Sequence, residues 1–416
     1  MNRRQALKLL LSTGALATMP ISFLRAANSI TPDRFLIMMS ARGGWDVTSI
    51  CDPKGNVQYA TGSEFINRYT TNDIRTAGNL RYAPLPTGTN FDVDWMDYVF
   101  QNHGQYMTVI NGINCLTGSH AQGSYYFSSG QSFADFPVIG ALQAAPYASQ
   151  MAMPFYAANA HAATGGEVSA VQVNSSNTLN KLLKVNPNQA TSIHNMLVTK
   201  RKEIIDHLGY NPATVSKAET WRQFKEADIS STNIAKVLDY LPATTSNGTK
   251  FQSEFIAALL ASGQCAAAAF GNSGGFDTHT NNDARTAQAT NNLFDEINHL
   301  WNELERHGIA SKTTLMIGSE FGRTPWFNNK NGKDHWATGS IILMSKGIPG
   351  NRIIGSSNDA LKPNKVNPNT LAIDNVNGIE ITIQHVHRAL RNHLGLQASN
   401  LDAKYPIPVE SLNLFS

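Results

Sequence analysis

The sequence predicts an α/β fold with a mostly parallel sheet and a helical insertion. Five continuous apolar runs have the length and composition of strands that are buried on both faces. A segment with helical spacing lies between the third run and the fourth, and strands that alternate with helices are typical of a parallel sheet covered by helices. The five runs span residues 35–39, 107–111, 264–270, 313–318 and 340–344.

Residues 284–307 are predicted to form a long helix, because their apolar side chains recur at intervals of three and four residues. Residues 189–260 hold most of the remaining helical patterning, with candidate helices at 194–207, 217–227 and 252–261. Prolines and a polar stretch separate these helices. We expect a helical insertion between the two halves of the sheet, with no catalytic cluster inside it.

The first 27 residues have the layout of an export signal. Arg3 and Arg4 form a twin-arginine motif, an apolar stretch follows over residues 9–24, and the small residues Ala26 and Ala27 offer a cleavage site. The alternative is a membrane anchor that is never cut. The apolar stretch is short and interrupted by polar residues and a proline, which favours cleavage.

These features predict a signal peptide over residues 1–27 and one α/β domain over residues 28–416. The expected export partner is the twin-arginine translocase. We expect a periplasmic or secreted protein with no stable membrane span after cleavage. Without the four basic residues of the signal, the chain has 29 basic and 30 acidic residues. A nucleic-acid partner is therefore not expected, since it requires a concentrated basic face.

The chain has three cysteines, Cys51, Cys115 and Cys265. The first two follow predicted strand ends, so a disulfide between them is one possibility in an oxidising compartment, with free thiols as the other. Cys265 lies within a predicted buried strand, and we expect an inert core thiol.

Four clusters of acidic, basic or histidine residues follow or adjoin the predicted strands, at residues 42–46, 275–279, 319–323 and 333–336. Loops at the carboxyl ends of parallel strands converge in space, and Asp, Glu and His bind hard or borderline divalent cations. Two carboxylates 4 Å apart repel by about 4 kcal/mol at an effective dielectric near 20. Convergence therefore predicts a metal site or strongly shifted pKa values.

The first two clusters contain candidate metal ligands. Asp46 follows a glycine pair that lets the backbone turn after the strand, although Asp46 could instead cap the next helix. Asp277 and His279 point to the same side of an extended segment, so both could bind one cation. The alternative is a helix cap and a surface histidine.

The other two clusters add Glu320, Arg323, Asp334 and His335. Glu320 is a candidate metal ligand, and Arg323 could hold an anionic group in fork geometry; alternatively the two form only a buried salt bridge. Asp334 and His335 point apart in an extended chain, so one is expected to bind metal and the other to orient it.

Ser119 is the candidate nucleophile. It is predicted to begin a helix, where backbone N–H groups favour a developing anion, and a bound metal could activate its hydroxyl. A plain helix-capping serine is the alternative. The histidines of the C-terminal helix, His385, His387 and His393, are expected to be surface or packing residues.

These motifs together resemble the uncharacterised-domain family numbered 1501, whose members are often exported by the twin-arginine system. That family is similar in fold to the alkaline phosphatase and sulfatase superfamily. The resemblance implies an alkaline-phosphatase-like three-layer α/β/α sandwich. The motifs are Gly-Gly-Trp-Asp46, Ser119-His120, Asp277-Thr-His279, Ser-Glu320-Phe-Gly-Arg323 and Asp334-His335.

The resemblance also implies a site. One metal would use Asp277, His279 and His335, and a second would use Asp46, Ser119 and Glu320. The chain departs from the superfamily at Phe321, where a histidine is usual, unless His120 or Asp334 replaces that ligand. The serine loop also lacks the cysteine-containing motif that sulfatases convert into their nucleophile.

The function expected from these observations is an exported metal-dependent hydrolase that acts on a phosphate or related ester. One or two divalent ions, zinc or manganese, would bind a small anionic substrate. Ser119 or a metal-bound water would attack, and Arg323 and Arg42 would stabilise the transferred group. The alternative is a non-catalytic periplasmic protein that binds metal or assists envelope assembly and retains the fold.

Overall fold

The computed structural model describes residues 32–59, 64–86, 89–171, 235–272 and 274–415. The predicted signal peptide and the candidate helices at 194–207 and 217–227 lie outside the described residues. In the described part, no helix is both long and apolar enough to cross a membrane.

Within the described residues, an eight-stranded sheet forms the middle layer, in the order β12-β4-β11-β8-β1-β7-β5-β6. Every pairing in it is parallel except the two that β11 makes, with β4 and with β8. The strands are β1 (Phe35–Ser40), β4 (Met107–Asn114), β5 (Phe155–Ala158), β6 (Ala170–Val171), β7 (Ala267–Gly271), β8 (Thr313–Gly318), β11 (Thr338–Met344) and β12 (Arg352–Ile354).

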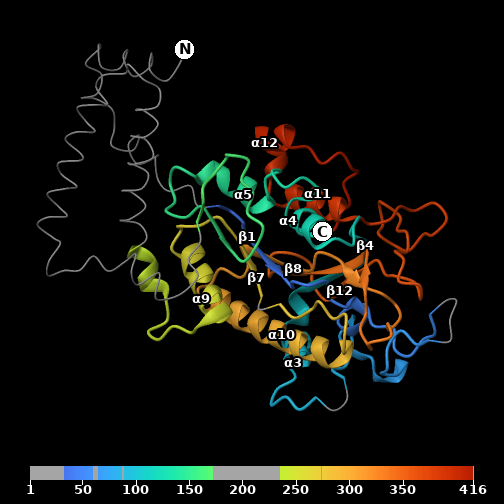
Figure 1. Cartoon of the computed structure of the whole chain (residues 1–416). Coiled ribbons are helices and arrows are strands. Elements are labelled where there is room, and N and C mark those ends of the chain that lie inside the picture. The colour runs from blue at the N-terminus through green and yellow to red at the C-terminus, as the bar shows by residue number, and fades with distance from the viewer. Residues whose placement is uncertain (1–31, 60–63, 87–88, 172–234, 273, 416) are drawn as a thin grey trace, which may run out of the picture. The chain divides into compact units, whose positions relative to one another are not determined.

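Helices cover both faces of this sheet (Figure 1). Side chains alternate along β1, so Ile37 and Met39 join one apolar cluster while Leu36 and Met38 join the other. The first cluster includes α3 (Trp95–His103), α9 (Gly248–Ala261) and α10 (Asn282–Arg306). The second includes α4 (His120–Ser129), α5 (Ile139–Ala144) and α11 (Ile383–His393), and the short α12 (Asn400–Lys404) follows α11 in the chain.

The predicted fold class, a mixed α/β structure with a mostly parallel sheet, is confirmed. All five apolar runs form strands, although the third begins at Ala267 and so starts later than predicted. The long predicted helix is α10. The candidate helix at 252–261 lies within α9, which packs against α10 and β7 and so belongs to a layer that covers the sheet.

Two small antiparallel ribbons lie outside the main sheet. One pairs β2 (Arg75–Ala77) with β3 (Leu80–Tyr82). The other pairs β9 (Gly322–Arg323) with β10 (His335–Trp336), which places His335 opposite Arg323. The second ribbon therefore joins two of the four clusters that the sequence singled out.

All three cysteines are buried and free. The Cys51–Cys115 disulfide that the sequence left open is therefore not formed in this structure. Burial raises the pKa of Cys115 and of Cys265 to about 12. Neither thiol is a reactive group at neutral pH.

Candidate metal centre

The four clusters meet at one edge of the sheet. Strands β1, β7 and β8 run parallel, and the loops that follow them carry Asp46, Asp277 and Glu320. His335 comes just before β11, and β11 runs antiparallel to β8. The amino end of β11 consequently lies at the same edge as the carboxyl ends of its neighbours, so His335 reaches the site from a strand of opposite direction.

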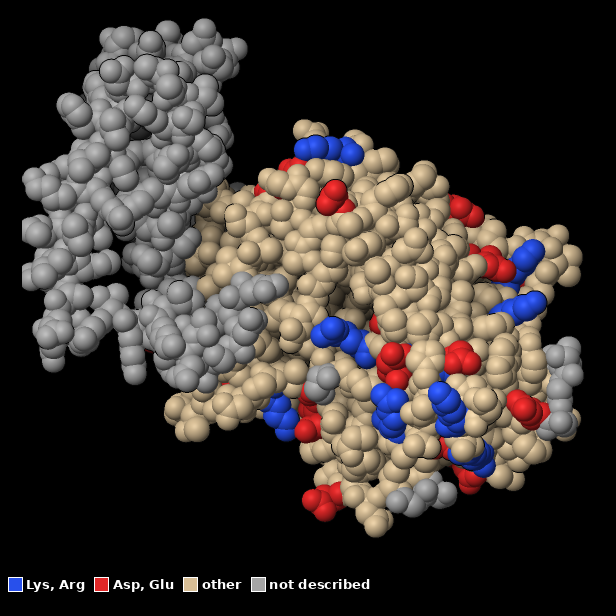
Figure 2. All heavy atoms as spheres, viewed as in Figure 1, with Lys and Arg blue, Asp and Glu red and all other residues tan. Residues whose placement is uncertain are grey.

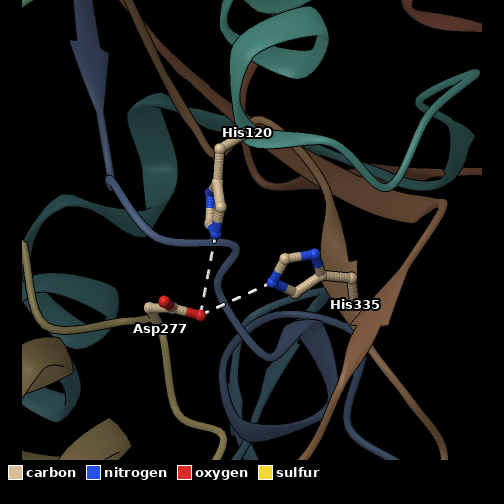
Figure 3. A group of neighbouring side chains, drawn as sticks. All are labelled: His120, Asp277 and His335. Carbon is tan, nitrogen blue, oxygen red and sulfur yellow. Dashed lines mark ion pairs between the residues drawn. The ribbon is translucent and has the colours of Figure 1, made fainter.

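Three imidazole rings surround one carboxylate oxygen. Asp277 Oδ1 lies 3.1 Å from Nε2 of His279, 3.5 Å from Nε2 of His335 and 3.7 Å from Nε2 of His120. Ligand atoms of His120, Asp277 and His335 all lie within 4.8 Å of one another. Figure 3 shows these three side chains pointing toward a common centre, with His120 at the start of α4.

The separations suit one metal ion. Metal–nitrogen and metal–oxygen bonds of roughly 2.0–2.1 Å place tetrahedral ligand atoms about 3.3 Å apart. The His279 and His335 Nε2 atoms are 3.0 Å apart, and both are near the Asp277 oxygen. Two nitrogen lone pairs at this distance repel unless a proton or a cation lies between them, so the donor set of this cluster fits a divalent ion.

The far side of each ring is occupied by a fixed acceptor. Nδ1 of His120 lies 2.7 Å from Glu320, and Nδ1 of His279 lies 2.7 Å from Asp334. Nδ1 of His335 lies 2.7 Å from the carbonyl oxygen of Gly118.

An acceptor at Nδ1 favours the proton on that nitrogen, which leaves the Nε2 lone pair free to bind metal. Glu320 and Asp334 are therefore placed to orient histidines rather than to bind the ion themselves.

The charges of the site stabilise its carboxylates. The hydrogen bond from His279 lowers the pKa of Asp334, and the hydrogen bond to Glu320 raises the pKa of His120. Burial alone would raise the pKa of Asp277, but the Arg323 guanidinium outweighs it and the pKa falls below its ordinary value. Asp277 is thus ionised at neutral pH, as a metal ligand must be.

Arg323 is fully buried and acts as an anchor for Asp277. Its Nη2 atom lies 2.7 Å from Asp277 Oδ1. The guanidinium also donates to the carbonyl oxygens of Gly43, Gly44 and Lys333. With its donors used in this way, Arg323 does not reach a substrate, and the direct contact with a substrate anion predicted for it is not supported by the geometry.

The glycine pair after β1 has the predicted turning role. Gly43 and Gly44 have φ values of +118° and +76°, which side chains disfavour. A Cβ on Gly43 would lie 2.5 Å from the backbone nitrogen of Asp277, and one on Gly44 would overlap the ring of Phe321. The two glycines therefore let the loop after β1 pack closely against Asp277 and Phe321.

Asp46 is not part of the histidine cluster and forms a buried ion pair with Lys333 instead. Both it and Lys333 have fully buried side chains, and their charged atoms are 2.8 Å apart. Asp46 also accepts hydrogen bonds from Thr48 and Ser49 at the start of the short helix Val47–Ser49. This geometry favours the capping alternative for Asp46, because a ligand to metal needs a free carboxylate.

Ser119 is exposed at the amino end of α4, and its hydroxyl makes no capping hydrogen bond. Its two neighbours both contact the site, since Gly118 accepts from His335 and His120 approaches Asp277. Ser119 therefore lies at the rim of the cluster, and its hydroxyl has no hydrogen-bond partner among the residues that the structure describes. Its predicted role as nucleophile stays a prediction.

His120 is the main site residue that the sequence motifs do not predict as a primary ligand. The sequence motifs indicate His120 only as a possible replacement for the histidine that is absent at Phe321. In the structure the Phe321 ring is buried, with its centroid 4.8 Å from that of His120 and 4.5 Å from that of His335. The Phe321 ring therefore packs against the rings of both histidines.

The face shown in Figure 2 carries basic and acidic side chains close to one another, and neither sign covers it continuously. The same mixture occurs beside the candidate metal centre, where Arg68 pairs with Asp283 at 2.8 Å.

The fold and the site define a mixed α/β protein with a candidate metal centre at one edge of its sheet. Residues 222–389 match the family described as protein of unknown function (DUF1501), which confirms the family resemblance drawn from the motifs. The matched segment includes Asp277, His279, Glu320 and His335, whereas His120 precedes it. No curated protein matches this chain in sequence.

Several solved structures are similar over most of their length. Ps i-CgsB is 7% identical over 92% of this chain and 75% of that chain, with a TM-score of 0.44. Alkaline phosphatase from the Antarctic bacterium TAB5 is 10% identical over 78% of this chain and 94% of that chain, with a TM-score of 0.32. PsFucS1 sulfatase from Pseudoalteromonas sp. is 10% identical over 86% and 70% of the two chains, with a TM-score of 0.31. Similarity of this size carries no conclusion on activity.

Proposed function

We propose that this protein is an exported, metal-dependent hydrolase of a phosphate or related ester. The observation that carries the proposal is the convergence of three imidazole Nε2 atoms on Asp277 Oδ1, each with its Nδ1 atom fixed by an acceptor. The proposed ligands of the ion are His120, Asp277 and His335, whose ligand atoms lie within 4.8 Å of one another and leave a fourth tetrahedral position open. The ester class comes from the family resemblance, and export comes from the layout of the first 27 residues.

The exposure of the site supports a catalytic ion over a structural one. The side chains of Asp277, His279 and His120 are 50%, 44% and 41% exposed. Structural metal sites are closed by protein ligands, whereas catalytic sites keep a position open to water or substrate. Mostly imidazole ligands favour zinc over a hard cation. One ion is proposed, because Asp46 and Glu320 are engaged elsewhere.

A bound ion would polarise an ester oxygen and lower the pKa of a coordinated water toward about 7. The chain supplies the orientation: Glu320 and Asp334 hold two rings in place, and Arg323 holds Asp277. Ser119 offers an exposed hydroxyl at the amino end of α4, where helix N–H groups favour negative charge. The nucleophile is therefore either this hydroxyl or a water.

The second candidate is a non-catalytic protein that binds metal and retains the fold. The burial of Arg323 favours it, since this arginine is not available to stabilise a transferred anionic group. The two candidates differ in turnover and agree on metal binding.

Metal analysis and hydrolysis of a panel of phosphate mono- and diesters test the proposal. We expect about one equivalent of zinc or manganese per purified chain, lost in His335→Gln. It should be retained in His103→Gln, whose ring contacts Asn298 away from the site. Ser119→Ala should keep the metal, and loss of turnover would identify the nucleophile. Metal-free wild-type protein would overturn the proposal, and metal-loaded protein without turnover would favour the second candidate.

A further inference from the structure

A cavity of about 310 Å³ lies beside the candidate metal centre. It opens where β1, β5 and β7 end and where α4 passes over them. Apolar side chains, including Phe127 and Phe270, line it together with polar side chains. The polar side chains are Ser40, Arg42, Ser124, Ser128, Asn159 and His161.

The cavity and the metal centre share two elements. Ser124 is one helical turn beyond His120 on α4, which separates their backbones by about 6 Å along the helix axis. Arg42 directly precedes Gly43, whose N–H donates to Glu320, the carboxylate that orients His120. A molecule bound at the metal centre is therefore within reach of the cavity.

Arg42 provides an uncompensated positive charge. Its guanidinium makes no hydrogen bond or ion pair with any residue that the structure describes, and no carboxylate lines the cavity. The stem of Arg42 lies against Gly271, where a Cβ would be 2.6 Å from Arg42 Cδ. The absence of a side chain at Gly271 thus leaves room for the arginine.

His161 adds an unsatisfied polar atom. Its Nε2 is buried and has no hydrogen-bond partner within the described residues. A buried polar atom without a partner is unfavourable, because it has lost its hydration without gaining a hydrogen bond. A ligand that supplies the missing partner recovers part of this cost.

We propose that this cavity binds an oxyanion attached to a hydroxylated group, as a second part of the substrate whose ester is cleaved at the metal centre. The assignment of the ligand as substrate rests on the proposed function. Arg42 matches a carboxylate, phosphate or sulfate in fork geometry. The serine hydroxyls and the Asn159 amide both donate and accept, which suits neighbouring hydroxyl groups of the ligand.

Binding is tested with three sugars that share a ring and differ in charge: D-glucuronate, glucose 6-phosphate and glucose. Titration calorimetry at constant ionic strength is carried out in His335→Gln protein, so that the metal centre does not contribute. We expect both anions to bind and glucose not to bind. Whether the carboxylate or the phosphate binds more tightly identifies the oxyanion.

Adding Arg42→Met keeps the aliphatic stem and removes the charge, and we expect anion affinity to fall at least tenfold. Adding Arg285→Met is the control, because Arg285 is exposed and does not line the cavity. Circular dichroism establishes that each variant is folded. Absence of anion binding, equal binding of glucose, or affinity unchanged by Arg42→Met would each overturn the inference.

The two proposals fail in different ways. If the metal-dependent hydrolase is wrong, wild-type protein lacks metal or turnover while the Arg42-dependent binding of anions persists. If the cavity assignment is wrong, wild-type protein keeps its metal and its turnover of small esters, while the charged sugars do not bind or bind with an affinity that Arg42→Met leaves unchanged.

Discussion

The buried ion pair of Lys333 and Asp46 allows a direct test of what Asp46 does. Lys333→Met removes the ammonium and leaves the carboxylate fully buried. Removing one partner of a buried pair costs about 3–5 kcal/mol. Asp46 keeps the hydrogen bonds from Thr48 and Ser49, so we expect the lower end, a loss of about 3 kcal/mol in the free energy of unfolding. Urea denaturation followed by circular dichroism measures this loss.

A double-mutant cycle separates the ion pair from a metal role. Asp46→Asn leaves the ammonium of Lys333 buried beside Thr48 and Asn67, so it should also be destabilising. The double variant carries no uncompensated charge. We expect its loss in the free energy of unfolding to be well below the sum of the losses in the two single variants. Additive losses would refute the reasoning. So would an Asp46→Asn protein that keeps its stability and loses its metal, which is the behaviour of a ligand.

Three further predictions concern the site and its support. Glu320→Gln should weaken metal binding by roughly 10–100-fold in competition with a chelator, and unchanged affinity would contradict its orienting role. Gly44→Ala should cost about 2–4 kcal/mol, because it combines a positive φ with overlap against Phe321. Gly166→Ala, with φ +80° and open space, should cost only about 1 kcal/mol. Burial lowers the pKa of His387 to about 3, so protonation favours the unfolded state. Stability should therefore fall by about 2 kcal/mol as the pH drops from 7.5 to 5. In His387→Gln that part of the pH dependence should vanish, and an unchanged slope in denaturation midpoints would disprove it.

The strands at the centre of the sheet were readable because burial on both faces leaves a continuous apolar run. The run at 313–318 coincides with β8. Strand β5 was missed because Phe155–Ala158 is short and half alanine, and β12 was missed because Arg352–Ile354 is only three residues long. The antiparallel direction of β11 could not be predicted from its apolar run, because a buried strand has the same pattern in either direction.

Residues 319–337, which connect β8 to β11, have no helical pattern. A parallel crossover usually contains a helix, so this absence is the one sign in the sequence that β11 is antiparallel to β8.

The clusters at strand ends predicted that Asp277, His279 and His335 meet, and the structure brings them together. Their assignment as ligands stays a prediction. The sequence could not predict which carboxylates bind the metal and which accept a hydrogen bond from a histidine. That division depends on which ring nitrogen of each histidine faces the carboxylate. Asp46 shows the same limit, because its basic partner, Lys333, is 287 residues away in the chain.

The position of β1 in the sheet has a consequence for the time at which this protein can fold. Leu36 pairs with Ala267, 231 positions later in the chain, and on its other side with Thr314. At a synthesis rate of roughly 5–20 residues per second, the first strand waits about 10–45 seconds for its first partner in the sheet. During that interval an apolar strand is unpaired, and the histidines and Asp277 have no common centre. The candidate metal centre is therefore a late product of folding, and any ion it binds must arrive after the chain is nearly complete.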